Sequence, residues 1–247
     1  MISGKRVIAA MLTALMAVTF TANTAVSVYA TGVTATENAQ TIDAQSTDAQ
    51  ALTPEEQKAQ ELQQVYDMPV ESNGYKDWPQ GPGTYGEAGI VMEVGTGAIL
   101  YAKNIDAHEY PASITKVLTA LVALENGQLT DNVTFSHDSV AFLQRGDSSV
   151  GLKEGNVITL DQAMHAMLLA SANEAAYAIG ESVGVNAGHD YNWFIEQMNS
   201  RCKELGGENS NFANTNGLHD PNHYTCARDM ALIGRELFKH PEFFQIV

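Results

Sequence analysis

PASITKVLTALVAL, residues 111–124, contains a single charged side chain, Lys116, in an otherwise apolar and small-residue run. Such a run predicts a helix buried on all sides, and Pro111 just ahead of it favours a sharp entry. Ser113 and Lys116 are three residues apart, so on a helix they face the same side. A buried amine can stay neutral and take the proton of a serine hydroxyl. The stretch therefore predicts a central helix that carries an activated serine nucleophile.

A second Ser-x-x-Lys occurs at Ser200–Lys203, inside residues 192–205, NWFIEQMNSRCKEL. Charged and apolar residues alternate there as on a surface helix, so Lys203 would stay solvated and protonated. The context of the two motifs, and not the spacing alone, favours Ser113 as the nucleophile.

Toward the N-terminus, residues 88–94 and 98–103 are strand-like runs separated by Gly95-Thr96-Gly97, which predicts a β-hairpin. Toward the C-terminus, Gly127 provides a stop for the nucleophile helix. A hairpin followed by mainly helical patterns indicates an α+β fold, with an antiparallel sheet flanked by a helical cluster.

Ser171-Ala172-Asn173 falls in the break between two further predicted helices. Thr159 to Gln162 has the form of a capping box and opens the first helix, which runs to Leu169; the second covers residues 174–182. Polar groups at such a break can project into a cleft, although Ser171 or Asn173 could instead simply cap the second helix. The Ser113/Lys116 pair makes a role in the same site the preferred interpretation.

The remaining patterns suggest structure and no chemistry. Residues 133–150 look irregular or briefly helical, and Arg145-Gly146-Asp147 within them reads as a turn and not as an adhesion motif. Residues 214–224 are dense in turn formers and precede a helix over about 225–239. His219 and His223 are spaced like a helical metal pair, but Pro221 argues against a helix, so zinc is disfavoured.

The first 77 residues divide into two segments. Residues 1–30 carry Lys5 and Arg6, an apolar run and a small-residue end, which predicts an export signal cleaved after Ala30; an uncleaved anchor is the alternative. Residues 31–77 form a predicted low-complexity linker, with a short helix from Pro54 to about Tyr66. The catalytic domain is assigned to residues 78–247.

Charge argues against one class of partner, and the cysteine content bears on a possible disulfide. A formal net charge of −16 disfavours a nucleic-acid partner. Cys202 and Cys226 could form a disulfide in an exported protein, but two cysteines do not make a disulfide framework. The sequence leaves open whether the two thiols are paired or free.

Several motifs, in order, resemble the low-molecular-mass penicillin-binding proteins, the serine D-alanyl-D-alanine carboxypeptidases of the β-lactamase-like superfamily. The resemblance runs from about Trp78 to the C-terminus and includes residues 90–101, 111–116, 169–176, 216–220 and 227–231. It implies a β-lactamase/transpeptidase-like fold, and an enzyme that is secreted or acts at the extracytoplasmic face of the cell envelope.

The resemblance also implies roles. Ser113 would attack the penultimate D-alanine carbonyl of a peptidoglycan stem peptide ending in D-Ala-D-Ala, with Lys116 as its base. Ser171 would relay a proton to the leaving amine, Asn173 would bind the substrate amide, and the Ser113 N–H would be one oxyanion donor. β-Lactams would acylate Ser113, and no metal or organic cofactor is needed.

Two departures qualify the resemblance. Ala172 stands where many members have glycine, and no lysine is followed by Thr-Gly or Ser-Gly, so the family's Lys-Thr-Gly motif is absent. The expectation is an incomplete catalytic domain that lacks the later sheet strands and any C-terminal membrane attachment. The alternatives are a serine β-lactamase, whose Glu-x-x-Leu-Asn string is absent, and a catalytically silent wall-binding or β-lactam-sensing module. A metal-dependent peptidase ranks last.

Overall fold

The computed structural model describes residues 52–247. The predicted export signal and residues 31–51 of the predicted linker lie outside these residues. Contacts divide the chain at Glu61, and Leu62–Val247 forms one compact unit. The predicted short helix is present as α1, Pro54–Tyr66, and it begins at a capping box in which Thr53 and Glu56 exchange hydrogen bonds.

The compact unit starts earlier than residue 78. Strand β2 (Ile99–Lys103) holds the preceding segment: the Lys103 ammonium donates to the carbonyls of Val65 and Thr84, both at 2.6 Å. The Ala102 N–H also donates to the hydroxyl of Ser72, in the short 3-10 turn η1 (Glu71–Gly74). Composition could not reveal these contacts, because they join residues 19 to 38 positions apart in the sequence.

The predicted hairpin is present. Strand β1 (Gly89–Met92) pairs antiparallel with β2, with Val91 opposite Tyr101 and a bulge between Val91 and Met92. The turn is closed by the Glu93 carboxylate, which accepts from the N–H groups of Gly95 and Thr96. In this turn Gly97 has a φ of +77°, a conformation that favours glycine.

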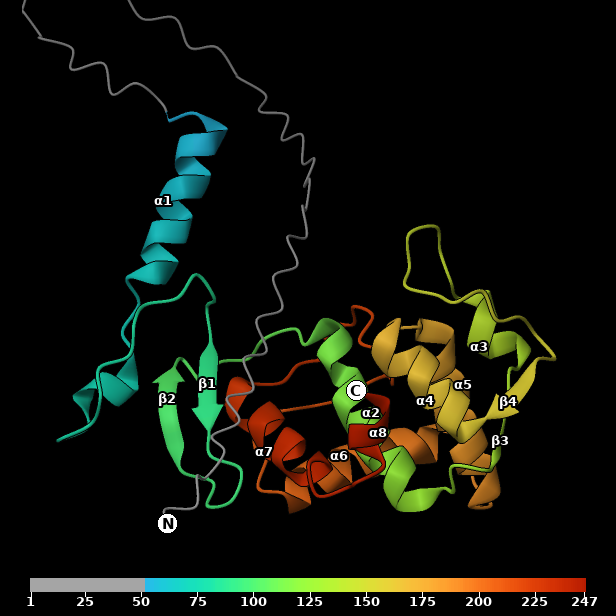
Figure 1. Ribbon diagram of the computed structural model, residues 1–247. Coiled ribbons are helices and arrows are strands. Elements are labelled where there is room, and N and C mark those ends of the chain that lie inside the picture. Colours follow the sequence, from blue (N-terminus) through green and yellow to red (C-terminus); the bar gives the residue numbers. More distant parts are fainter. Residues whose placement is uncertain (1–51) are drawn as a thin grey trace, which may run out of the picture. The chain divides into compact units, whose positions relative to one another are not determined.

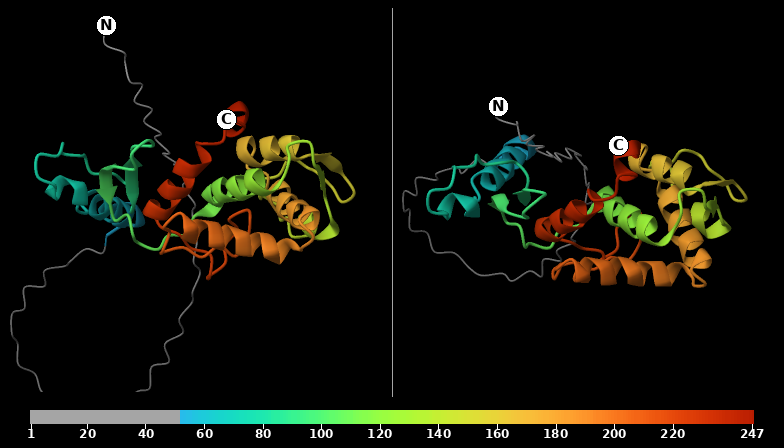
Figure 2. Two further views of the ribbon diagram at one scale, coloured as in Figure 1. Left: turned by 90° about the horizontal axis from the view of Figure 1, so that it is seen from below. Right: turned by 60° about the horizontal axis from the view of Figure 1, so that its bottom comes forward.

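Helix α2, Thr115–Asn126, lies at the centre of the helical cluster. It contacts four helices, and they are α4 (Leu160–Leu169), α5 (Asn173–Asn186), α6 (Tyr191–Glu204) and α7 (Ala227–Leu237). The views in Figures 1 and 2 show α7 between the hairpin and α2, and α7 contacts β1. The short α8 (Phe243–Ile246) packs on α4. The boundaries expected for these helices agree with the structure to within a few residues.

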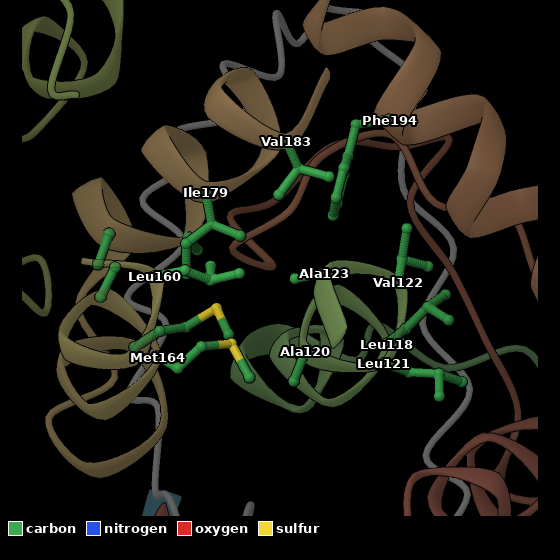
Figure 3. Packing of buried hydrophobic residues seen from close by; sticks show 14 of the residues in the cluster. Leu118, Ala120, Leu121, Val122, Ala123, Leu160, Met164, Ile179, Val183 and Phe194 are labelled. Carbon is green, nitrogen blue, oxygen red and sulfur yellow. The ribbon is translucent and has the colours of Figure 1, made fainter. Parts of the chain in front are cut away.

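The hydrophobic core explains why α2 carries so little charge. Figure 3 shows Leu118 and Ala120 of α2 in the same cluster as Met164 of α4, Ile179 of α5 and Phe194 of α6, and all five are fully buried. Burying one large apolar side chain contributes about 1.5–3 kcal/mol. The prediction of a helix buried on all sides is confirmed, and its start is held in place by this packing.

A second small sheet lies at the far end of the cluster. Strands β3 (Asn132–Thr134) and β4 (Val157–Thr159) pair antiparallel, with Val133 opposite Ile158, and α3 (His137–Ala141) follows β3. The brief helix was expected, whereas β3 was missed because three residues are too few to show alternation. The described part of the chain is thus α+β. In residues 52–247 no helix has the length and hydrophobicity needed to cross a membrane.

Candidate active site

Ser113 lies in a 3-10 turn, η2 (Ala112–Ile114), immediately before α2, and not in the α-helix itself. The preceding residue, Ala112, has a φ of +48°, which is uncommon for a residue with a side chain. The turn exposes Ser113 while the following residues of α2 are buried. The predicted shared face still holds, because the Lys116 amine lies 3.1 Å from the Ser113 hydroxyl.

Lys116 is buried, with 2% of its surface exposed, and has no carboxylate in hydrogen-bond contact. Its Nζ contacts three oxygens: the Ser113 hydroxyl at 3.1 Å, the Asn173 side-chain carbonyl at 2.8 Å and the Asn216 backbone carbonyl at 2.7 Å. Burial lowers the pKa of Lys116 to about 8, with the charge of Glu174 opposing the change. A substantial fraction of this amine is therefore neutral near physiological pH.

Ser171 and Asn173 reach the same site from the break between α4 and α5. The Ser171 hydroxyl donates to the Ser113 hydroxyl at 2.9 Å, and the φ of Ser171 is +55°. Asn173 is the first residue of α5, and its N-cap, Ala172, makes no side-chain capping bond. Both polar side chains thus point to the Ser113/Lys116 pair. The structure brings together all four residues selected from the sequence.

Glu174, the next residue, is fully buried and organises the flanking loop. One of its carboxylate oxygens accepts from the Ser149 hydroxyl and from the N–H groups of Val150 and Gly151, while the Asn173 N–H donates to the Ser148 carbonyl. These contacts fix residues 148–151 beside the Ser171–Asn173 segment. Sequence reasoning gave Glu174 no such role.

The loop 214–218 is a part of the site that the sequence did not identify. The Asn216 carbonyl accepts from Lys116, and the Thr215 carbonyl accepts from the Thr119 hydroxyl at 2.7 Å. Both donors lie on one face of α2, so the loop is joined to the nucleophile helix at two points. The density of turn formers signalled a loop here but could not show which carbonyls face Lys116.

Replacing Gly217 with alanine is expected to damage the site and the fold. Its φ is +87°, and an added Cβ would lie 1.8 Å from the carbonyl oxygen of Ala112, the residue before Ser113. We expect the free energy of unfolding to fall by at least about 2 kcal/mol, and acylation of Ser113 to slow at least about tenfold.

Gly188 is the matched control for this substitution, because its φ is +83° but nothing lies within 4 Å of an added Cβ. Gly188→Ala should cost only about 1 kcal/mol and leave the acylation rate unchanged. Chemical denaturation and acylation kinetics measure both quantities; equal losses in the two variants would contradict the close contact of Gly217 with Ala112.

His219 and His223 have different surroundings. The His223 ring is 1% exposed; its Nδ1 accepts from the Ala213 N–H, so its Nε2–H donates to the Thr115 hydroxyl at 2.8 Å. His219 instead lies edge to face with Tyr110, at 4.8 Å between ring centres. His223 therefore ties the segment after Asn214 to the first residue of α2, a role that sequence reasoning missed.

Acid is expected to destabilise the fold through His223. Burial lowers its pKa from 6.5 to about 4, so between these values the unfolded chain binds a proton that the folded chain does not. Stability is then lost as pH falls from about 6.5 to 4, by about 3 kcal/mol in total. Urea denaturation at several pH values measures this slope.

His223→Gln should flatten that dependence, because glutamine does not titrate. His137→Gln is the control, since the His137 side chain is 72% exposed. An unchanged slope in His223→Gln would mean that another group senses the acid.

The other sequence predictions have plain outcomes. Ser200 and Lys203 are exposed on α6, as expected for the second Ser-x-x-Lys. Residues 144–147 form a turn in which the Asp147 carboxylate accepts from the Gln144 N–H. Cys202 and Cys226 are both free and buried, and burial raises the pKa of each thiol to about 11, so neither is a thiolate nucleophile.

The family model and the curated relatives that match this chain have the same description. A family model described as D-alanyl-D-alanine carboxypeptidase matches residues 79–247. The D-alanyl-D-alanine carboxypeptidase DacF of Bacillus subtilis is 33% identical over 159 residues, which are 62% of this chain and 39% of that protein. DacB2 of Mycobacterium tuberculosis is 31% identical over 182 residues, 73% of this chain and 59% of that protein. The chain spans about two fifths of the length of the first curated relatives it matches.

Solved structures show the same similarity. Penicillin binding protein 5 from Haemophilus influenzae superposes with a TM-score of 0.61 at 32% identity, covering 68% of this chain and 49% of that one. A Streptomyces DD-transpeptidase gives a TM-score of 0.59 at 29% identity, covering 64% of this chain and 62% of that one. The expected transpeptidase-like α+β fold is thereby confirmed.

Proposed function

The chain belongs to the D-alanyl-D-alanine carboxypeptidase family, peptidase S11, and we propose that it carries the acylating serine of an enzyme that removes the terminal D-alanine from peptidoglycan stem peptides. One observation carries the proposal: Ser171, Ser113 and Lys116 form a continuous hydrogen-bonded chain, with 2.9 Å and 3.1 Å between successive polar atoms. In this chain the nucleophile lies between a proton relay and a base, which are the groups that acyl transfer requires.

In the proposed acylation step, Lys116 acts in its neutral form. Its two N–H bonds are directed at the oxygens of Asn173 and Asn216, which leaves the lone pair for the Ser113 hydroxyl proton. As the proton moves to Lys116, Ser113 Oγ bonds to the carbonyl carbon of the penultimate D-alanine and the carbonyl oxygen becomes an oxyanion. The Ser113 N–H is one donor for that oxyanion, a contribution of about 3 kcal/mol to the barrier.

Collapse of the intermediate breaks the bond to the terminal D-alanine. The leaving amine takes a proton from the Ser171 hydroxyl, and the proton that Lys116 accepted from Ser113 restores that hydroxyl, so no proton is gained or lost over the step. Water then attacks the ester, releasing the shortened stem peptide and restoring the Ser113 hydroxyl. The buried Asn173 side chain, 5% exposed, both fixes Lys116 and offers its amide N–H to the substrate.

The remaining elements of the proposal follow from the substrate. Peptidoglycan lies outside the cytoplasmic membrane, so the protein would act there, either secreted or held at the envelope. A β-lactam presents a strained amide in place of the D-Ala-D-Ala bond and would acylate Ser113 as an inhibitor.

The test is release of D-alanine from a synthetic peptide ending in D-Ala-D-Ala, measured together with benzylpenicillin labelling and with turnover of a chromogenic cephalosporin. D-Alanine release with slow cephalosporin turnover supports the proposal. Rapid cephalosporin turnover would identify a β-lactamase, and a stable penicillin adduct without D-alanine release would identify a silent binding module. If neither labelling nor release occurs on a folded chain, the proposal fails.

A further inference from the structure

Glu174, the second residue of α5, is a buried carboxylate that the acylation step above does not use. One of its oxygens accepts from the Ser149 hydroxyl at 2.7 Å and from the N–H groups of Val150 and Gly151 at 2.8 and 3.2 Å. The other oxygen has no hydrogen-bond partner, and none of the ion pairs within residues 52–247 includes Glu174. A buried carboxylate without a cationic partner is costly, and such groups gather at functional sites, where they change the proton affinity of their neighbours.

Lys116 is the group on which this carboxylate can act. It lies on α2, which packs against α5, and it is itself buried with no carboxylate in hydrogen-bond contact. The residue directly before Glu174 is Asn173, whose side-chain oxygen accepts from Lys116 at 2.8 Å. Burial lowers the pKa of Lys116, and the charge of Glu174 opposes this change. When Lys116 takes the Ser113 proton, a buried cation forms, and a nearby negative charge lowers its free energy.

The other titratable groups around the start of α2 keep one charge state at the pH values that matter here, or they have other partners. His223 contacts Thr115 and Tyr191 contacts Thr215, but burial lowers the pKa of His223 to about 4 and raises that of Tyr191 to about 12. Charged side chains on the other helices packed against α2 have partners other than Lys116, and they include Asp161 and His165 of α4, Arg201 of α6, and Arg228 and Asp229 of α7. In the part of the chain that the structure describes, Glu174 is therefore the charged group that acts on Lys116.

We propose that Glu174 is a positioning residue of the acylation step, whose negative charge stabilises Lys116 once that amine has taken the Ser113 proton. The same carboxylate holds residues 148–151 beside the Ser171–Asn173 segment. The inference rests on the proposed function and adds a residue to it. Because the charge favours the protonated amine, it makes Lys116 a stronger base and raises the pH at which Lys116 becomes neutral.

The test is the pH dependence of benzylpenicillin acylation in Glu174→Gln. Glutamine has the same shape, and its side-chain oxygen can still accept the three bonds from residues 149–151, so the variant removes the charge and keeps the loop contacts. The inflection of the rate, at about pH 8 in the unsubstituted chain, should move down by about one pH unit, and the plateau at high pH should fall about threefold. The variant is then about threefold faster than the unsubstituted chain at pH 6 and about threefold slower at pH 10. A purely structural defect would slow acylation at every pH.

Two controls separate the charge from the loop. Ser149→Ala removes one loop contact and keeps the charge, so the inflection should stay at about pH 8 whatever the rate. Glu181→Gln removes a half-buried carboxylate two turns further along α5, where it accepts from the Ser136 hydroxyl, and it should keep both rate and inflection. Circular dichroism checks the fold of each variant. Should Glu174→Gln not fold, Glu174→Leu gives the same reading of the inflection, since it replaces the buried charge by an apolar side chain of similar volume.

Three outcomes would overturn the inference while the proposed function stands, because labelling still occurs in each. They are an unchanged inflection in the folded charge-free variant, a rate lowered by the same factor at every pH, and an inflection that shifts as much in Ser149→Ala as in Glu174→Gln. Absence of benzylpenicillin labelling on the unsubstituted chain would reject the proposed function, and this inference with it.

Discussion

Ser113→Ala abolishes covalent labelling of the chain by benzylpenicillin. The Ser113 hydroxyl is the group within reach of the Lys116 amine, and the Ser171 hydroxyl bonds to it from the other side. Without Ser113 Oγ, no hydroxyl contacts the base, and removal of a nucleophile typically costs about 10⁴-fold or more in rate. Intact-mass spectrometry after a fixed incubation should show one added penicillin on the unsubstituted chain and none on the variant.

Ser200→Ala is the matched control, since Ser200 begins the other Ser-x-x-Lys of the chain and is exposed on α6. Its labelling should equal that of the unsubstituted chain. Ser113 is itself exposed, so its replacement should change the free energy of unfolding by less than about 0.5 kcal/mol. A penicillin adduct of normal yield on Ser113→Ala would show that another residue is the nucleophile.

Lys116→Arg is expected to slow acylation by about 10³-fold or more. A guanidinium keeps the positive charge but cannot be deprotonated in this pH range, so no base remains for Ser113. General-base catalysis alone contributes about 10²–10⁴-fold, and the larger group also displaces the oxygens of Asn173 and Asn216. Stopped-flow or quenched labelling with benzylpenicillin measures the rate.

The pH dependence of acylation distinguishes loss of the base from general damage. Lys116 must be neutral to accept a proton, and its pKa is about 8. The acylation rate of the unsubstituted chain should therefore rise as pH increases through about 8 and level off above it. Lys203→Arg, at the second Ser-x-x-Lys, should keep both rate and profile. A profile that is flat between pH 6 and 10 would argue against Lys116 as the base.

Local patterns were sufficient to predict the hairpin and the buried helix, and to select four residues that the structure brings together. The reason is that each depends on residues near in sequence: Gly95 to Gly97 for the turn, the apolar run after Lys116 for α2, and the Ser171–Asn173 break between two helices. The α-helix was expected to include Ser113, whereas α2 begins two residues later, at Thr115. Ser113 belongs to a 3-10 turn, because Ala112 adopts a positive φ that packs its carbonyl against Gly217.

Tertiary contacts account for what the sequence could not indicate. The Asn216 carbonyl contacts Lys116, and any residue type has a carbonyl, so no side-chain pattern marks this position. The spacing of His219 and His223 resembles that of a metal-binding pair, but the His223 ring contacts the Thr115 hydroxyl and the Ala213 N–H. Thr115 and Ala213 are far apart in the sequence. The attachment of Val65 and Ser72 to β2 likewise pairs a side chain with a backbone group distant in the sequence. These contacts can be identified only from the folded structure.

Peptide mapping of the penicillin adduct locates the nucleophile at single-residue level. Trypsin cleavage after Lys103 and Lys116 yields residues 104–116, NIDAHEYPASITK, in which Ser113 is the single serine. We predict that this peptide carries the added mass and that fragmentation places it on Ser113. An adduct on a peptide containing Ser171 or Ser200 would contradict the assignment of Ser113 as the acylated residue, and with it the proposed mechanism.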